Sequence, residues 1–357
     1  MEFWKMNGAG NDFIVVDDRR NAVPDHRWPE LARTLCQRHL SIGADGLMVV
    51  KPPVCGGDYR MLFFNSDGSM GEMCGNGARC ICRYGYENGL AGDVQRVETT
   101  AGLVTGWRMD QRQYRVRLND PCHIRLDGRA EVDGRTYDYA YLELGDPGIP
   151  HAAVPMAGLR GCDQAALFHL GRQLRYYKDF PKGANVNFYE LIGPDHVYER
   201  TYERGVEDFT YACGTGTGSV VTVLTLLGKV SGKNVQVDMT GGRLVIDVER
   251  DAAGRVADLY LTGPTNIEGV PGTWKVTEIS DAGRLPYCHS AKAAKQPYFS
   301  EYKNRTVRRT ALFFALFQQL SLFWGLGIFT AMPLTSTPSS AGMRMYFRPS
   351  MTRASIM

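Results

Sequence analysis

The sequence lacks the features that mark several large classes of protein. Its formal net charge is only +3 over 357 residues, so we expect no nucleic-acid partner. The N-terminal residues "MEFWKMNGAGNDF" do not show the basic and then apolar pattern of a secretory signal, so we expect a cytoplasmic protein. No phosphate-binding glycine motif follows a predicted strand, which argues against a nucleotide. With 44% hydrophobic and 22% charged residues, the composition is that of an ordinary globular protein.

Paired C-x-x-C spacing is also missing, although the chain has nine cysteines. Cys74, Cys80 and Cys82 do not have the spacing of common zinc sites, so we predict no metal. A reducing compartment fits an odd number of scattered cysteines better than a disulfide framework does. A lone cysteine is most often a small buried hydrophobe. This interpretation is preferred for Cys36, Cys55, Cys80, Cys82, Cys122, Cys162 and Cys288.

The other two cysteines belong to an internal repeat. "ACGTGTGS" around Cys213 echoes "MCGNGARC" around Cys74, 139 residues earlier. Other echoes are separated by 140 residues: "GADGLMVV" and "GANVNFYE", "VETTAGLV" and "VDMTGGRL", and Asn11 and His151. Glycine-rich turns resemble one another in many proteins, but several echoes at a single separation indicate two similar halves.

Local patterns predict the same kind of structure in each half. Segments such as "FIVVDD", "LMVVKP" and "YRMLFFN" are rich in β-branched and aromatic residues and predict strands. A helix is predicted after Cys74, ending at Gly89, and another after Cys213, ending near Gly228. We therefore expect an α+β protein with a half at 1–118, a half at 119–262 and a segment, 263–281, that returns to the first half.

A cysteine at the start of a helix has a chemical advantage. The free N–H groups and the partial positive charge at that end favour a thiolate and bind an anion such as a carboxylate. We therefore expect a lowered thiol pKa at Cys74 and Cys213. Two such units facing each other could invert the α-carbon of an amino acid, one thiolate removing the proton and the opposite thiol supplying another. This scheme needs no cofactor.

Five motifs together resemble the diaminopimelate epimerases, which are cofactor-independent isomerases of lysine and cell-wall precursor synthesis. The motifs are "KMNGAGNDFIVVD" (Lys5–Asp17), "NSDGSMGEMCGNGARC" (Asn65–Cys80), "GANVNF" (Gly183–Phe188), "YERGVEDFTYACGTGTGS" (Tyr202–Ser219) and "GGRLVI" (Gly241–Ile246). The resemblance covers about residues 1–281. It implies two pseudo-symmetric domains, each a rolled, mostly antiparallel and barrel-like sheet around a central helix. It also implies a cytoplasmic homodimer.

The resemblance assigns roles to individual residues. Cys74 and Cys213 take the places of the proton donor and acceptor, and His151 and Glu203 help to polarise the reacting site. The substrate-binding set comprises Asn11, Asn65, Gly75, Asn76, Asn185, Glu203, Arg204, Gly214 and Thr215. Arg204 can grip a carboxylate with two hydrogen bonds, and asparagines can both donate and accept, which suits an amino-acid terminus. Turn formation is the alternative role for Asn65 and Asn185.

Two departures from the family pattern affect the substrate assignment. Many members have Gly-Asn-Pro-His, whereas this chain has "GDPGIPH" (Gly145–His151), with Asp146 near the usual asparagine. A glutamine found in some members is replaced by Gly46. Two alternatives therefore stay open: a racemase of another amino acid such as histidine, and a non-enzymatic amino-acid-binding or redox-sensing protein whose two thiols form a reversible disulfide.

The tail at 282–357 fits neither half. Its segment "TALFFALFQQLSLFWGLGIFTAM" (Thr310–Met332) has no charged residue and follows Arg308 and Arg309. The length and composition are those of a marginal membrane span, although Gln318 and Gln319 interrupt it. A partner-binding helix is a second interpretation. The preferred one is a segment that is not a natural folded part of the protein, such as the product of a misplaced stop in the coding sequence.

Overall fold

The computed structural model describes residues 1–71, 74–270, 274–276 and 288–290. The chain divides into the units Met1–Ala293 and Ala294–Met357, and the second unit lies outside the described residues. The predictions for the apolar segment 310–332 fall there as well. Within the described part of the chain, no helix is long and apolar enough to cross a membrane.

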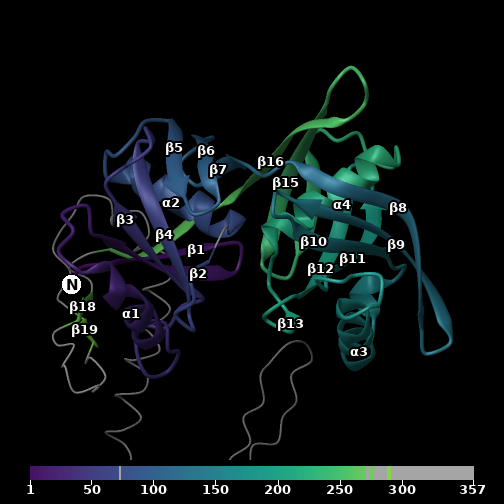
Figure 1. The fold of residues 1–357 in the computed structure, drawn as a ribbon, viewed down its shortest axis with the longest axis horizontal. Coiled ribbons are helices and arrows are strands. Elements are labelled where there is room, and N and C mark those ends of the chain that lie inside the picture. The colour runs from purple at the N-terminus through teal and green to yellow at the C-terminus, as the bar shows by residue number, and fades with distance from the viewer. Residues whose placement is uncertain (72–73, 271–273, 277–287, 291–357) are drawn as a thin grey trace, which may run out of the picture. The chain divides into compact units, whose positions relative to one another are not determined.

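Among the described residues, the first half contains two α-helices and seven strands, and the second half contains two α-helices and nine strands (Figure 1). The helices of the first half are α1 (Trp28–Leu35) and α2 (Gly75–Glu87). The strands are β1 (Trp4–Gly8), β2 (Asn11–Asp17), β3 (Gly46–Lys51), β4 (Tyr59–Asn65), β5 (Val94–Thr99), β6 (Gly102–Arg108) and β7 (Gln113–Arg117).

The second half has the helices α3 (Gln164–Arg175) and α4 (Gly214–Leu226). Its strands are β8 (Pro121–Val132), β9 (Arg135–Leu144), β10 (Ile149–Pro155), β11 (Asn185–Gly193), β12 (His196–Glu203), β13 (Asp208–Phe209), β14 (Val235–Met239), β15 (Gly242–Arg250) and β16 (Val256–Pro264). Three further strands are β17 (Asn266–Gly269), β18 (Trp274–Val276) and β19 (Cys288–Ser290).

Strand pairing repeats between the halves. The pairs β2–β3 and β4–β5 are parallel, and so are their counterparts β10–β11 and β12–β14. The hairpins β5–β6 and β14–β15 are antiparallel in both halves. The echoes in the sequence have a structural basis, because Gly43 and Gly183 both have a positive φ, of 74° and 63°, in the turns that lead into β3 and β11. The predicted fold class is confirmed.

Strands connect and pair across the junction between the two halves. After β7 the chain enters β8, which pairs with β9, and after β16 it returns in β17, which pairs with β1. Strand β16 also pairs with β7 in the first half and β15 in the second. The predicted boundary at 118 lies between β7 and β8, whereas the one at 262 lies inside the shared strand β16. The division into domains therefore stays a prediction.

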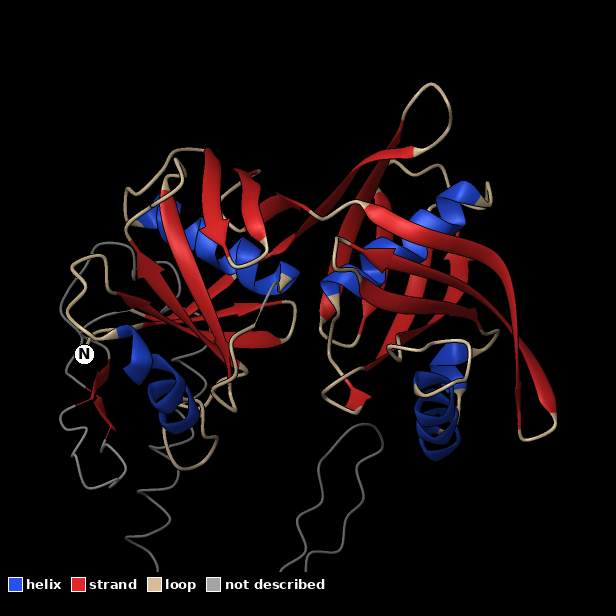
Figure 2. Ribbon diagram, viewed as in Figure 1, coloured by secondary structure: helices blue, strands red, loops and turns tan. Residues whose placement is uncertain are grey.

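Helices α2 and α4 lie inside the strands of their halves, as Figure 2 shows. Helix α4 is apolar on nearly every side, from Val220 and Val221 to Leu224, and is buried with the main core. Helices α1 and α3 were not predicted; each packs in a separate apolar cluster, α1 with β2–β4 and α3 with strands of the second half. The two central helices therefore carry both cysteines into the interior, each at a helix start.

Candidate active site

Cys74 and Cys213 hold equivalent positions at the starts of the two central helices. Cys74 is the N-cap residue of α2, with φ −129° and ψ 111°, and Cys213 is the N-cap residue of α4, with φ −121° and ψ 103°. The Cys74 sulfur accepts a hydrogen bond of 3.4 Å from the Gly77 N–H. The Cys213 sulfur lies 3.6 Å from the Thr215 hydroxyl. Both thiols therefore lie at the free N–H end of a helix, as predicted.

The two helix starts meet at their first glycines. A Cβ atom on Gly75 would lie 3.7 Å from the Gly214 Cα, and one on Gly214 would lie 3.5 Å from the Gly75 Cα. Either Cβ would come within 2.8 Å of Leu261 on β16. The two helix starts are therefore within contact distance of each other, and the tight approach at both glycines is to the Leu261 side chain.

The expectation of lowered thiol pKa values is wrong. Burial raises the pKa of Cys74 to about 11, although hydrogen bonds from Gly77 and Asn76 oppose the rise. Burial also raises the pKa of Cys213 well above its ordinary value. The negative charge of Glu203 raises both. Loss of hydration therefore outweighs the helix-end effect, because the sites are deep and a carboxylate lies near both sulfurs.

The rate of alkylation should report the raised pKa of Cys74 directly. The rate at which iodoacetamide modifies Cys74 in the ligand-free protein should rise with pH well beyond pH 8.5, because only the thiolate reacts and burial raises the pKa. Mass spectrometry of the modified peptide would measure it, with the exposed Cys55 as internal control. A rate that is already constant from pH 7 upward would contradict the assignment.

Asn76 connects the helix starts to the rest of the site. Its Nδ2 donates to the Asn11 Oδ1 over 2.6 Å and lies 3.4 Å from the Ala212 carbonyl, next to Cys213. Its Oδ1 accepts from Arg79 over 2.8 Å. Asn76 therefore joins the two halves at the thiols and is only 2% exposed.

Arg79 is a buried cation that the sequence did not single out. It is 0% exposed, donates to the Gly75 carbonyl and to Asn76, and forms no ion pair in the described part of the chain. Burial lowers its pKa to about 10, so it is charged at neutral pH. Its positive charge favours the Cys74 thiolate. The charge thus opposes the effect of Glu203 at this sulfur.

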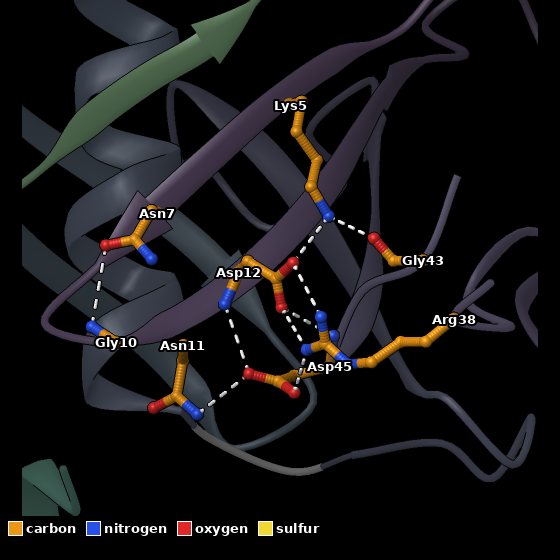
Figure 3. A network of polar contacts seen from close by, with 8 residues as sticks. All are labelled: Lys5, Asn7, Gly10, Asn11, Asp12, Arg38, Gly43 and Asp45. Atoms are coloured by element: carbon orange, nitrogen blue, oxygen red, sulfur yellow. Dashed lines mark hydrogen bonds and ion pairs between the residues drawn. The ribbon is translucent and has the colours of Figure 1, made fainter. Parts of the chain in front are cut away.

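Asn11 is held on its other side by Asp45, within the network drawn in Figure 3. The Asn11 Nδ2 donates to the Asp45 carboxylate over 3.1 Å. Arg38 bridges Asp45 and Asp12 at 2.7 and 2.6 Å, and Asp12 also pairs with Lys5. A row of hydrogen bonds therefore runs from Arg79 through Asn76 and Asn11 to Asp45. Because each amide donates on one side and accepts on the other, the row fixes the orientation of both amides.

On the second half, Asn185 and Arg204 lie together. The Asn185 Oδ1 accepts from the Arg204 backbone N–H over 2.8 Å, and its Nδ2 donates to the Pro150 carbonyl over 3.2 Å. The Arg204 guanidinium donates to the Lys182 carbonyl over 3.2 Å and is partly exposed. Asn185 thus anchors the Arg204 backbone, while the guanidinium keeps donors for a ligand.

His151 lies on β10, beside Asn185 on β11 in the strand register. It is 1% exposed, and burial together with the Arg204 charge lowers its pKa to about 3. Its Nε2 is buried without a hydrogen-bond partner. Despite the altered "GDPGIPH" segment, whose Asp146–Pro147 peptide is cis, His151 and Arg204 are close enough to interact electrostatically.

Of the remaining predicted site residues, Glu203 influences both thiols, whereas Asn65 makes its side-chain hydrogen bond elsewhere. Glu203 ends β12, and burial raises its pKa, with the Asp45 charge adding to the rise. Asn65 ends β4 and donates to the Ser69 hydroxyl over 2.9 Å, so no contact with the thiols is seen for it. At Gly46, a Cβ atom would lie 2.8 Å from the Phe64 carbonyl, so packing against β4 excludes the side chain that some relatives have there.

The chain is similar to a family of known proteins. Residues 3–123 and 145–267 match the family model for diaminopimelate epimerase. The chain is 38% identical over 273 residues to the diaminopimelate epimerase of Aquifex aeolicus, with 74% of this chain and 94% of that protein covered. It is 36% identical over 278 residues to the Archaeoglobus fulgidus enzyme of that name, with 73% and 92% covered.

Solved structures support the fold. A probable proline racemase from Agrobacterium radiobacter superposes with a TM-score of 0.57 at 19% identity, with 75% of this chain and 91% of that chain covered. A phenazine biosynthesis protein of the PhzF family from Bacillus anthracis gives 0.58 at 14%, with 75% and 96% covered. The match to the family model covers more than half of the chain and carries both cysteine motifs. The chain therefore belongs to the diaminopimelate epimerase family.

Proposed function

We propose that this protein is an isomerase that interconverts LL- and meso-2,6-diaminopimelate, in lysine and peptidoglycan precursor biosynthesis. The observation that carries the proposal is the paired placement of Cys74 and Cys213, each the N-cap residue of a central helix, where the two helix starts meet. Membership of the diaminopimelate epimerase family supports the choice of substrate.

In the proposed mechanism the substrate's α-carbon lies between the two sulfurs. One cysteine, as thiolate, takes the α-proton, and the other, as thiol, delivers its proton to the opposite face, so that the centre is inverted. The negative charge that develops spreads into the α-carboxylate. N–H groups of Gly75, Asn76, Gly214 and Thr215 at the two helix starts stabilise that charge. The cysteines then exchange roles for the reverse reaction.

Substrate binding also changes the electrostatic surroundings of the Cys74 and Cys213 thiols. Both have raised pKa values, so the thiolate has to form as the substrate's positive ammonium group enters beside it. The Arg79 charge helps at Cys74. Binding and ionisation are thereby coupled, which limits thiolate chemistry to the occupied site.

The polar residues divide between the two ends of the substrate. Arg204 suits the distal carboxylate, because its guanidinium keeps free donors. Asn65, Asn185 and Glu203 complete the set proposed for the distal end, and Asn11 and His151 contact the substrate near the reacting centre. We also propose that the enzyme needs no cofactor and is a cytoplasmic homodimer.

Turnover of stereochemically pure substrates tests the proposal. The full chain, kept reduced, should convert LL-diaminopimelate to the meso isomer, as measured by chiral chromatography, and should leave a panel of other L-amino acids, histidine included, unchanged. The variant with both Cys74→Ala and Cys213→Ala should be inactive, and Cys55→Ala, which changes an exposed thiol, should retain full activity. Racemisation of another amino acid in preference to diaminopimelate would refute the substrate, and binding without turnover would refute the enzyme.

A further inference from the structure

Four buried polar side chains lie in a row that ends at His151. Behind it come Asn187 on β11 and then Thr201 and Glu199 on β12, and the four are 1%, 0%, 3% and 0% exposed. The His151 Nδ1 lies 3.3 Å from the Asn187 Nδ2. The Asn187 Oδ1 lies 3.0 Å from the Thr201 Oγ1, which lies 3.2 Å from the Glu199 Oε1. Polar groups at such depth normally have at least one hydrogen-bond partner, which limits how the protons of the row can be arranged.

The strand register places this row. Asn187 and Thr201 are direct partners in the antiparallel pair β11–β12. Glu199 and Thr201, two residues apart on β12, point to the same face of the sheet. That face is turned towards α4, because a Cβ atom on Gly216 of α4 would clash with the Asn187 Oδ1. The row therefore runs beneath the second thiol.

The backbone fixes the orientation of the Asn187 amide. Its Nδ2 lies 3.3 Å from each of two carbonyl oxygens, those of Ala152 and Asn185. Carbonyl oxygens only accept hydrogen bonds, so this end of the amide must be the NH₂ group. The Oδ1 end then faces Thr201, and the Thr201 hydroxyl must donate to it.

Two protonation states follow from that orientation. The Asn187 NH₂ group can only donate, so a proton on the His151 Nδ1 would meet another donor, and the imidazole proton is therefore placed on Nε2. The Thr201 hydroxyl lies within hydrogen-bond distance of both Asn187 and Glu199 but has a single proton. With that proton on the Asn187 side, a carboxyl proton on Glu199 would complete the row. The Glu199 Oε2 and the His151 Nε2 are the two ends of the row that have no partner.

We propose that Glu199, Thr201 and Asn187 form a hydrogen-bond relay that holds His151 as a neutral imidazole with its proton on Nε2. His151 then serves the active site as a hydrogen-bond donor rather than as a base. The part of the inference that concerns the substrate rests on the proposed function: near the reacting centre, an N–H donor suits an oxygen of the substrate's α-carboxylate. Glu199, Thr201 and Asn187 are positioning residues, because they act through His151.

The electrostatics of the site agree with two uncharged groups. Burial and the Arg204 charge lower the pKa of His151 to about 3, and burial raises that of Glu199 to about 8. The groups facing Glu199 include Thr217 on α4 and Cys213, and no Lys or Arg forms an ion pair with it in the described part of the chain. A neutral Glu199 also spares Cys213 an adjacent negative charge, which would oppose its thiolate.

Nitrogen-15 NMR of the full chain with labelled histidine tests the protonation state without reference to activity. His151→Gln identifies the signal by its disappearance. At pH 7 we expect Nε2 to carry the proton and Nδ1 to be unprotonated. A proton on Nδ1, or an imidazolium signal, would overturn the relay. This readout remains valid if the protein does not act on diaminopimelate, so the failure of one proposal can be told from the failure of the other.

Two conservative variants test the direction of the hydrogen bonds. Glu199→Gln puts an NH₂ donor in place of the carboxyl proton. Its kcat/KM should therefore stay within about threefold of the parent value, and the His151 tautomer should be unchanged. Thr201→Val keeps the shape but breaks the row, and we expect kcat/KM to fall about tenfold. Thr201→Ser should restore it.

Glu190→Gln is the matched control, since Glu190 lies on β11 and its side chain accepts a hydrogen bond from the Gly158 N–H, away from the row. Glu190→Gln should change neither kcat/KM nor the His151 tautomer. A loss of 100-fold or more in Glu199→Gln would contradict the proposal, because it would mean that Glu199 works as an ionised group. An undiminished kcat/KM in Thr201→Val, with the tautomer retained, would contradict it equally.

Discussion

Replacing Cys213 by alanine is expected to lower kcat for diaminopimelate epimerisation by about three orders of magnitude, and replacing Cys74 should do the same. General acid–base catalysis contributes about 10² to 10⁴ per group, and inversion needs both groups. Each thiol reaches only one face of the α-carbon. Neither loss can therefore be compensated by the partner cysteine.

The single variants should also differ from each other in a way that packing damage cannot imitate. Each keeps one thiol, which can remove and return a proton on its own face without inversion. Slow α-proton exchange should therefore survive with one isomer in Cys74→Ala and with the other in Cys213→Ala, as NMR in heavy water would show. Retention of full epimerisation in either variant, with Cys55→Ala as control, would refute the two-thiol mechanism.

The second large effect is expected at Arg79. Arg79→Met should lower kcat/KM about 10- to 100-fold, because it removes a buried charge near Cys74 and the donor that orients Asn76. The pKa of Cys74 should rise further, since the lost cation had favoured its thiolate. Steady-state kinetics and the pH dependence of Cys74 alkylation would measure the two effects separately.

Arg83→Met is the matched control for that change. Arg83 lies one turn further along α2, is partly buried, and donates to the Thr265 carbonyl. Its removal should leave the pH dependence of Cys74 alkylation unchanged. Arg79→Lys should retain most of the effect on the thiol and lose much of the orientation of Asn76, because an ammonium cannot reproduce two guanidinium contacts. An alkylation profile unaltered in Arg79→Met would show that the charge does not act on Cys74.

The internal repeat made the central part of the fold predictable. Two Cys-Gly-x-Gly segments before helical patterns placed both cysteines at helix starts, where the structure has them. Helices α1 and α3 were missed although their apolar residues, such as Leu167, Leu170 and Leu174, recur at helical spacing. The helical spacing is present in the sequence, but these segments lie outside the repeated motifs.

Other features of the site depend on three-dimensional packing. The raised thiol pKa values follow from burial and from Glu203, which is 10 residues from Cys213 and far from Cys74 in the chain. The pairing of Asn187 with Thr201 follows from the strand register, which residue types alone do not specify. Arg79 lies inside one of the repeated motifs, yet only the folded structure shows that it is buried and forms no ion pair among the described residues.

Deuterium incorporation during the first turnovers is the most direct test of the central claim. In heavy water, with the full chain and LL-diaminopimelate, a mechanism with one monoprotic thiol on each face predicts one deuterium at the inverted α-carbon of the meso product. The recovered LL substrate should still be undeuterated at low conversion. Meso product that retains the original proton, or exchange of the LL substrate ahead of inversion, would contradict the account.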